Sequence, residues 1–156
     1  MSIKIGQQAP DFSLYNTEKN KVSLSDFKGR NVLLLFFPQA FSSICTKELC
    51  SVRDDISRYK QANAVVLGIS VDSVNSLNRF REDQNFDFQL LSDFNKETSR
   101  AYDAIYENWV LDMKGVSKRS AFIVDKEGKI AYAEVLESPA DLPNFDAINQ
   151  TLAGLQ

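Results

Sequence analysis

Residues 32–45, VLLLFFPQAFSSIC, contain the pattern that decides the fold. Residues 32–37 form a continuous apolar run, which is typical of a strand that is buried on both faces of a sheet. After a short loop, apolar residues recur from Ile44 onward at near-helical spacing, with charged residues between them. This spacing predicts an amphipathic helix that extends to about Lys60 and carries Cys45 in its first turn.

The rest of the chain predicts an alternation of strands and helices. Residues 120–125 and 129–136 flank the turn KEG, whose glycine favours a hairpin. The other expected elements are a small hairpin within residues 10–30, a second buried strand at 64–71, a helix at 73–84, a short strand within FDFQLLSD, a short helix at 96–104 and a closing helix at 144–155. This order predicts a single α/β domain over residues 1–156, with a thioredoxin-like fold, an N-terminal β-hairpin extension and a central mixed sheet flanked by helices.

Composition and charge exclude several classes of protein. The 156 residues carry a net charge of −3 and no basic tract, so we expect no nucleic-acid partner. No apolar run approaches the ~20 residues of a membrane span, and the first residues lack the apolar core of a signal peptide. We therefore expect no membrane association and a cytoplasmic, reducing location, where the two cysteines are reactive or incidental thiols and not a disulfide framework.

The chain contains no histidine. This excludes Ser-His-Asp and Cys-His catalysis and the H-E-x-x-H zinc site. Two cysteines without histidine also argue against a structural zinc site, and we expect no metal or other cofactor. Any chemistry must therefore use cysteine, carboxylate, arginine, lysine or tyrosine side chains.

The position of Cys45 at a helix start suits a reactive thiol. The free N–H groups and the dipole of a helix N-terminus favour negative charge, and the thiolate is the nucleophilic form of cysteine. Ser42 or Ser43 is placed to cap the helix or to donate a hydrogen bond to the sulfur, and Pro38 fixes the backbone where the chain leaves the strand. The pattern predicts a partly exposed, activated thiolate; the alternative is an inert cysteine buried at a helix start.

The stretch PQAFSSIC matches a known signature, Pro-x-x-x-Thr/Ser-x-x-Cys, with Pro38, Ser42 and Cys45. On this motif, and on the colinear segments GQQAPDFSL, VSLSDFKGRNVLLLFF, VLGISVDS, LLSDFNKETSRAY and KRSAFIVDKEGKIAYAEV, the chain resembles the peroxiredoxin family over nearly its whole length. FFPQAFSSICTKEL is most similar to the alkyl hydroperoxide reductase E (AhpE) branch. The second cysteine, Cys50, is instead similar to that of the bacterioferritin comigratory protein (PrxQ) branch.

The resemblance implies a thiol peroxidase that reduces hydrogen peroxide and organic hydroperoxides. Cys45 would attack the peroxide and become a sulfenic acid, while Ser42, the backbone near Cys45 and Arg119 stabilise the thiolate and the leaving oxygen. Without the resemblance, Arg119 would be interpreted as a surface charge at the start of a strand, and Lys118 beside it is the weaker candidate. Glu48 matches a frequent acid of the family that orients the arginine; the alternative is a solvated helical acid.

The role of Cys50 leaves two hypotheses open. In an intact helix, residues five positions apart are separated by about 8–9 Å between Cα atoms, beyond the ~7 Å limit for a disulfide. Cys50 is therefore either the resolving cysteine, which reaches Cys45 after the first helical turns unwind, or a passive small residue, with an external thiol resolving the sulfenic acid. By resemblance, the first is the PrxQ pattern and the second the AhpE pattern.

The resemblance also implies partners. We expect a thioredoxin- or glutaredoxin-like reductant and a homodimer, with Phe37, Phe41 and Trp109 at an interface that borders the active site; the alternative for these aromatic residues is core packing. Two other functions fit the same fold. One is a thioredoxin-like thiol-disulfide oxidoreductase, which would need C-x-x-C, and the other is a non-catalytic binding module that uses FFPQAF as a docking patch.

Overall fold

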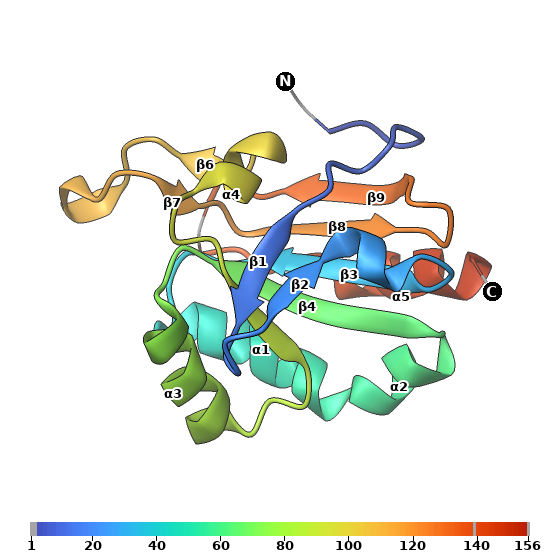
Figure 1. Ribbon diagram of the computed structural model, residues 1–156, viewed down its shortest axis with the longest axis horizontal. Coiled ribbons are helices and arrows are strands. Elements are labelled where there is room, and N and C mark those ends of the chain that lie inside the picture. Colours follow the sequence, from blue (N-terminus) through green and yellow to red (C-terminus); the bar gives the residue numbers. More distant parts are fainter. Residues whose placement is uncertain (1–2, 139, 156) are drawn as a thin grey trace.

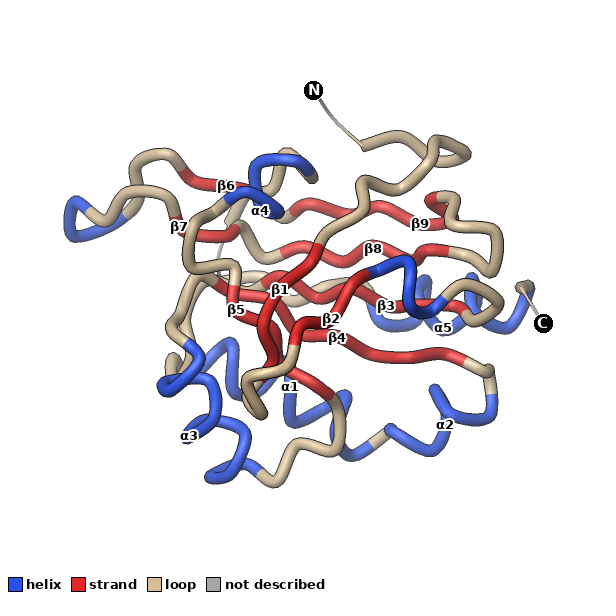
Figure 2. Tube along the Cα trace, in the orientation of Figure 1, coloured by secondary structure: helices blue, strands red, loops and turns tan. Residues whose placement is uncertain are grey.

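The computed structural model describes residues 3–138 and 140–155. Its main feature is a seven-stranded sheet in the order β2-β1-β5-β4-β3-β8-β9, which runs across the middle of the molecule in Figure 2. β3, β4 and β5 are parallel to one another, whereas the other neighbours pair antiparallel. The strands are β1 (Ser13–Asn16), β2 (Lys21–Ser23), β3 (Asn31–Phe36), β4 (Ala64–Ser70), β5 (Gln89–Ser92), β8 (Ser120–Val124) and β9 (Ile130–Val135). The predicted central mixed sheet is confirmed.

Helices cover one face of this sheet and a mixture of segments covers the other. The helices are α1 (Ser43–Asp54), α2 (Ile56–Gln61), α3 (Val74–Gln84), α4 (Glu97–Ala101) and α5 (Phe145–Gly154), with a short 3-10 helix η1 (Leu24–Phe27). α1, α2, α3 and α5 contribute to one apolar core, and α1, α2 and α3 lie below the sheet in Figure 1. The opposite core is closed by the segment before β1, by η1 and by the residues that follow α4.

β3 is an interior strand of the sheet, next to the central strand β4, and it leads into the loop before Cys45. All six of its residues are buried, and it pairs in parallel with β4 and antiparallel with β8. Because strand side chains alternate, Leu33 and Leu35 belong to the helix-side core, while Leu34 and Phe36 belong to the opposite core. The continuous apolar run therefore does become a strand buried on both faces.

Two predicted elements differ in detail. The N-terminal hairpin is present, but it is no separate extension: β1 pairs with β5, so the hairpin forms an edge of the main sheet. The helix expected from Ile44 to about Lys60 is interrupted at Asp55, between α1 and α2. Asp54 and Asp55 put two acids at the negative end of the α1 dipole, and the Asp55 N–H bonds the carbonyl of Val52, three residues back, at 3.1 Å.

A small two-stranded ribbon was not predicted. β6 (Ile105–Tyr106) pairs with β7 (Val116–Ser117), and the segment between them, with the 3-10 turn η2 (Val110–Asp112), projects from the left side of Figure 1. Two-residue strands are too short to show a period in sequence. Within the described parts of the chain, no helix has the length and apolar character to cross a membrane.

Candidate active site

The connection from β3 to α1 places Cys45 in the interior. Pro38 is buried directly after the strand, Ser42 occupies the N-cap position of α1, and Cys45 lies in the first turn. Cys45 is on the same helix face as Leu49 and Val52, which pack into the helix-side core, so its exposed fraction is 0%. The predicted partial exposure of this thiol is therefore wrong, because the amphipathic face of α1 that fixes the helix to the sheet includes Cys45.

The Ser42 hydroxyl does not cap α1. It donates to the carbonyl of Gln39 at 3.2 Å, and no side-chain cap is formed. Ser42 contributes through its carbonyl instead, which accepts from the Thr46 hydroxyl at 2.8 Å and from the Thr46 N–H at 2.9 Å. The expectation of a Ser42 hydroxyl cap is thus wrong, because this hydroxyl is used to close the preceding loop.

Arg119 reaches Cys45 from the start of β8, the strand that pairs with β3. It directly precedes β8, and Ser120 pairs with Phe36 at the end of β3, so strand pairing brings residues 45 and 119 together. The Nη2 group of Arg119 donates to Cys45 Sγ at 3.3 Å, and the side chain is almost completely buried. The interpretation of Arg119 as a surface charge is therefore wrong, and its neighbour Lys118 points elsewhere, with its ammonium 5.6 Å from the Tyr106 ring centroid.

Glu48 holds the other branch of the same guanidinium. Arg119 Nη1 donates to Glu48 Oε1 at 2.5 Å, and the carboxyl group is fully buried rather than solvated. Burial raises the pKa of Glu48 to about 7, although the charge and hydrogen bond of Arg119 act in the opposite direction. Its second oxygen, Oε2, has no hydrogen-bond partner in the described part of the chain. One buried cation is thus shared by a carboxyl group and a thiol.

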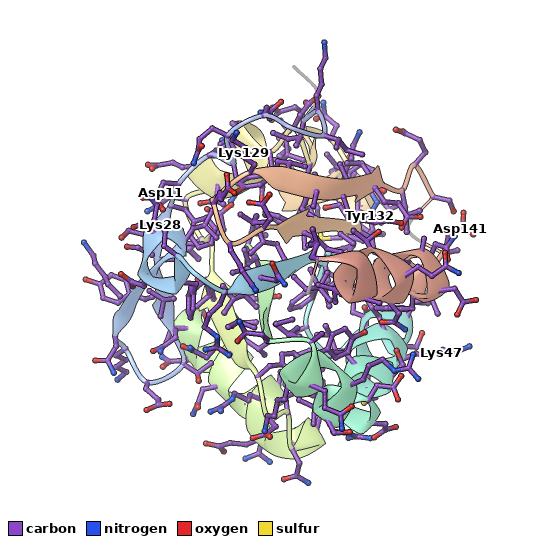
Figure 3. All side chains as sticks on the ribbon, turned by 90° about the vertical axis from the view of Figure 1, so that its right-hand side faces the viewer. Asp11, Lys28, Lys47, Lys129, Tyr132 and Asp141 are labelled. Atoms are coloured by element: carbon purple, nitrogen blue, oxygen red, sulfur yellow. The ribbon has the colours of Figure 1, made fainter. Side chains whose placement is uncertain are left out.

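The charge on Arg119 is stabilised by these neighbours. Burial disfavours the charged form, but the adjacent Glu48 carboxylate and Cys45 sulfur outweigh burial and raise the pKa of the guanidinium. Lys47, between Cys45 and Glu48 in sequence, is exposed and extends from α1 at the edge of the molecule in Figure 3. Its charge is therefore solvated, and the forked cation beside the sulfur is Arg119.

Cys50 lies in a different environment. It is half-buried, and its thiol donates to Gln84 Oε1 of α3 at 3.4 Å. Both cysteines are free. This agrees with the expectation that an intact α1 keeps the two sulfur atoms apart.

Asp72 supports the loop and was not assigned a role from sequence. It follows β4, and its Oδ2 accepts from the Ala40 N–H at 2.8 Å and from the Ser70 hydroxyl at 2.7 Å. The amide of Gln39 also donates to the sulfur of Met113, which follows η2, at 3.0 Å. The sequence did contain a signal for Asp72: it is an acid directly after a buried strand that neighbours β3. Loops at the carboxyl ends of adjacent parallel strands lie close together, so this acid could be expected near the loop before Cys45.

The three aromatic residues expected at an interface lie in different places. Phe37 is fully buried in the helix-side core, so the core-packing alternative holds for it. Phe41 is 51% exposed and its ring centroid is 5.1 Å from that of Phe80. Trp109 is half-buried and stacks on Tyr106 with ring centroids 5.6 Å apart. Only Phe41 and Trp109 therefore offer surface to a partner.

A cysteine in the first turn of a helix, paired with a buried forked cation on a mixed α/β sheet, defines a thiol-dependent enzyme of the thioredoxin-fold class. The AhpC/TSA family model matches residues 5–133. Peroxiredoxin Bcp of Bacillus subtilis is 36% identical over 132 residues, which cover 83% of each chain.

Solved structures agree. The peroxidoxin BcpB of Mycobacterium tuberculosis matches with a TM-score of 0.87 at 28% identity, over 99% of both chains. A cysteine-to-serine mutant of PrxQ from Xylella fastidiosa matches with a TM-score of 0.87 at 25% identity, over 99% of this chain and 98% of that one. The chain belongs to the AhpC/TSA family and is a peroxiredoxin, a thiol peroxidase. The similarity to the PrxQ branch is confirmed, and the oxidoreductase and binding-module alternatives are not favoured.

Proposed function

We propose that Cys45 is the peroxidatic cysteine of this enzyme and that it reduces hydrogen peroxide and organic hydroperoxides. The observation that supports this is the contact of 3.3 Å between its sulfur and Arg119. The thiolate attacks one peroxide oxygen, the O–O bond breaks, and the other oxygen leaves as water or an alcohol after it gains a proton. Cys45 is thereby oxidised to a sulfenic acid.

The residues around Cys45 have two proposed roles, which are charge stabilisation and positioning of the loop before α1. Arg119 stabilises the thiolate and the charge that develops on the leaving oxygen, and Glu48 orients its guanidinium. Pro38 fixes the chain at the end of β3, and Ser42 closes the loop and presents its polar groups beside the first turn of α1.

Cys50 is proposed as the resolving cysteine. Its thiol attacks the Cys45 sulfenic acid after the first turns of α1 unwind, which gives an intramolecular disulfide and water. The support is the similarity to relatives named Bcp and PrxQ, together with the half-buried position of Cys50. The alternative remains an external thiol that resolves Cys45 directly, with Cys50 passive.

Four further proposals concern the reductant, the oligomeric state, the location and the domain organisation. A thioredoxin- or glutaredoxin-like protein would regenerate the thiols, since thiol-disulfide exchange restores the reduced enzyme. A homodimer would use the exposed Phe41 and the half-buried Trp109 near the ribbon. We also propose a cytoplasmic location and a single domain over residues 1–156, because both apolar cores share one sheet.

Intact-mass and peptide-map analysis after one equivalent of hydrogen peroxide, without added thiol, tests the proposal. A Cys45–Cys50 disulfide is expected, and a Cys50→Ser variant should stop at the Cys45 sulfenic acid. If Cys45 becomes a sulfenic acid while Cys50 stays reduced in the wild-type protein, the external-thiol alternative holds. An unmodified Cys45 would contradict its peroxidatic role.

A further inference from the structure

Two contacts attach α1 to α3 beside Cys50, and the peroxide chemistry uses neither of them. The Cys50 thiol donates to Gln84 Oε1 at 3.4 Å, and Arg53 Nη1 donates to the main-chain oxygen of Gln84 at 2.6 Å. Gln84 is the last residue of α3, which lies at the lower left of Figure 1. We name this pair of contacts the Gln84 clamp.

The acceptor side of the clamp is a fixed helix end. The carbonyl of Gln84 is in the last turn of α3, where carbonyls have no partner within the helix. Arg53 supplies a cationic donor to it, which the negative end of the helix dipole favours. Asn85 then turns into the left-handed region with φ 54° and ends the helix. Leu77 and Phe80 bury the same helix in the core, so α3 is the stationary partner.

Oxidation affects the two ends of the Cys45–Cys50 segment differently. The Cys45 thiolate is held by Arg119 through a charge-assisted contact, and this contact weakens when the sulfur becomes an uncharged sulfenic acid. The clamp joins a thiol, an amide, a guanidinium and a carbonyl, none of which changes in the first step. After oxidation, the clamp is therefore a restraint on Cys50 that persists unchanged.

We propose that Gln84, together with Arg53, is a positioning residue for Cys50 that sets how fast the Cys45 sulfenic acid is resolved. The inference rests on the resolving role proposed for Cys50. In that step a Cys45–Cys50 S–S bond forms, the Cys45 S–O bond breaks, and the hydroxyl leaves as water with the Cys50 proton. In competition, a second peroxide oxidises the sulfenic acid to a sulfinic acid and leaves as water or an alcohol. The clamp thus sets the proportion of oxidised enzyme that forms the disulfide rather than the sulfinic acid.

Rapid-quench measurements of disulfide formation after peroxide addition test this inference. Gln84→Ala removes the acceptor for the Cys50 thiol and keeps a helix-forming residue, so we expect disulfide to form about threefold faster. Arg53→Gln removes a charged donor, and we expect an increase of about tenfold. The sulfinic acid produced at a fixed excess of peroxide should fall by the same factors, and the rate of the first oxidation should change by less than about twofold.

Matched variants separate the clamp from general loosening of the helices. Gln61→Ala and Arg58→Gln alter the same residue types in α2, and neither side chain has a hydrogen bond to α3 among the described residues. Both should leave the disulfide and sulfinic acid rates at wild-type values. Gln84→Glu keeps an oxygen acceptor for the Cys50 thiol that Gln84→Ala lacks, so its disulfide should form no faster than in the wild-type protein.

Two results would overturn the inference in distinguishable ways. If wild-type protein forms the disulfide and Gln84→Ala and Arg53→Gln form it at the same rate, the clamp does not govern resolution, and the resolving role of Cys50 stands. If no disulfide forms in any of these proteins while Cys45 becomes a sulfenic acid, the resolving role fails and the clamp inference fails with it. Peroxidatic action of Cys45 survives both results.

Discussion

The two cysteines of α1 lie five positions apart and have opposite surroundings. Cys45 is fully buried beside a guanidinium, on the helix face that packs against the sheet. Cys50 is half-buried on the face that meets α3, where its thiol donates to a neutral amide and the nearby guanidinium, Arg53, is partly exposed. A buried cation suits a nucleophile, and a partly accessible position suits a thiol that acts later or not at all. The helical offset therefore places the two thiols in different surroundings, which suit the two roles proposed for them.

Removal of each thiol is the strongest test of this comparison. Cys45→Ser should reduce peroxide consumption by about a thousandfold or more, because the hydroxyl is a far weaker nucleophile. Cys50→Ser should leave the first oxidation within about twofold of wild type, since the Cys50 thiol bonds Gln84 of α3 and not the peroxidatic sulfur. Stopped-flow competition with a second peroxidase measures both rates. Equal losses in the two variants would contradict the division of tasks.

Arg119 should be the next most sensitive position. Arg119→Met removes the cation beside Cys45 Sγ, and we expect the rate of peroxide reduction to fall about a hundredfold. Arg119→Lys should recover only part of it, because an ammonium does not contact both Cys45 and Glu48 as the fork does. Arg100→Met, at an exposed arginine of α4, is the control and should keep wild-type activity. Retained activity in Arg119→Met would contradict the proposal that this cation stabilises the thiolate and the leaving oxygen.

The buried acid of the Cys45 environment should give the protein a measurable pH dependence. The folded protein holds the pKa of Glu48 at about 7, above its ordinary value of 4.5, so it binds more protons than the unfolded chain between these values. The contribution to stability is complete below pH 4.5 and is lost as the pH rises through 7, by about 3 kcal/mol in total.

Urea unfolding at several pH values between 4.5 and 8 measures this loss. In Glu48→Gln the neutral amide does not titrate, so the decrease in stability with rising pH should be smaller than in the wild-type protein by that amount. Glu97→Gln, at an exposed acid of α4, should keep the wild-type slope. Identical slopes in wild type and Glu48→Gln would show that the buried carboxyl is not the titrating group.

Substitution of Asp72 tests whether the loop between β3 and α1 depends on its anchor at the end of β4. Asp72→Ala removes the acceptor for the Ala40 N–H and the Ser70 hydroxyl, which should cost about 1–2 kcal/mol of stability. Asp87→Ala removes an acid from an exposed ion pair and should change stability by less than about 0.5 kcal/mol. Thermal unfolding compares the two, and equal effects would show that the loop does not rely on Asp72.

Much of the molecule is determined by local sequence. The apolar run of β3, the amphipathic spacing of α1, the β8–β9 hairpin and the position of Cys45 at a helix start all follow from patterns within a few residues. The motif that ends in Cys45, together with its colinear segments, also identified the family. These features are recoverable from sequence because burial of one face imposes a period on neighbouring residues.

Tertiary structure alone decided the environment of each thiol. Residues 45 and 119 are brought together by the pairing of β3 with β8, and no period in the sequence records that register. The burial of Glu48, the anchoring of Ala40 by Asp72 and the contact of Cys50 with Gln84 likewise join residues from separate elements. The residue pattern was enough to propose Cys45 as the nucleophile. The packing of strands and helices decided which charges surround it, because electrostatic contacts depend on distance in space.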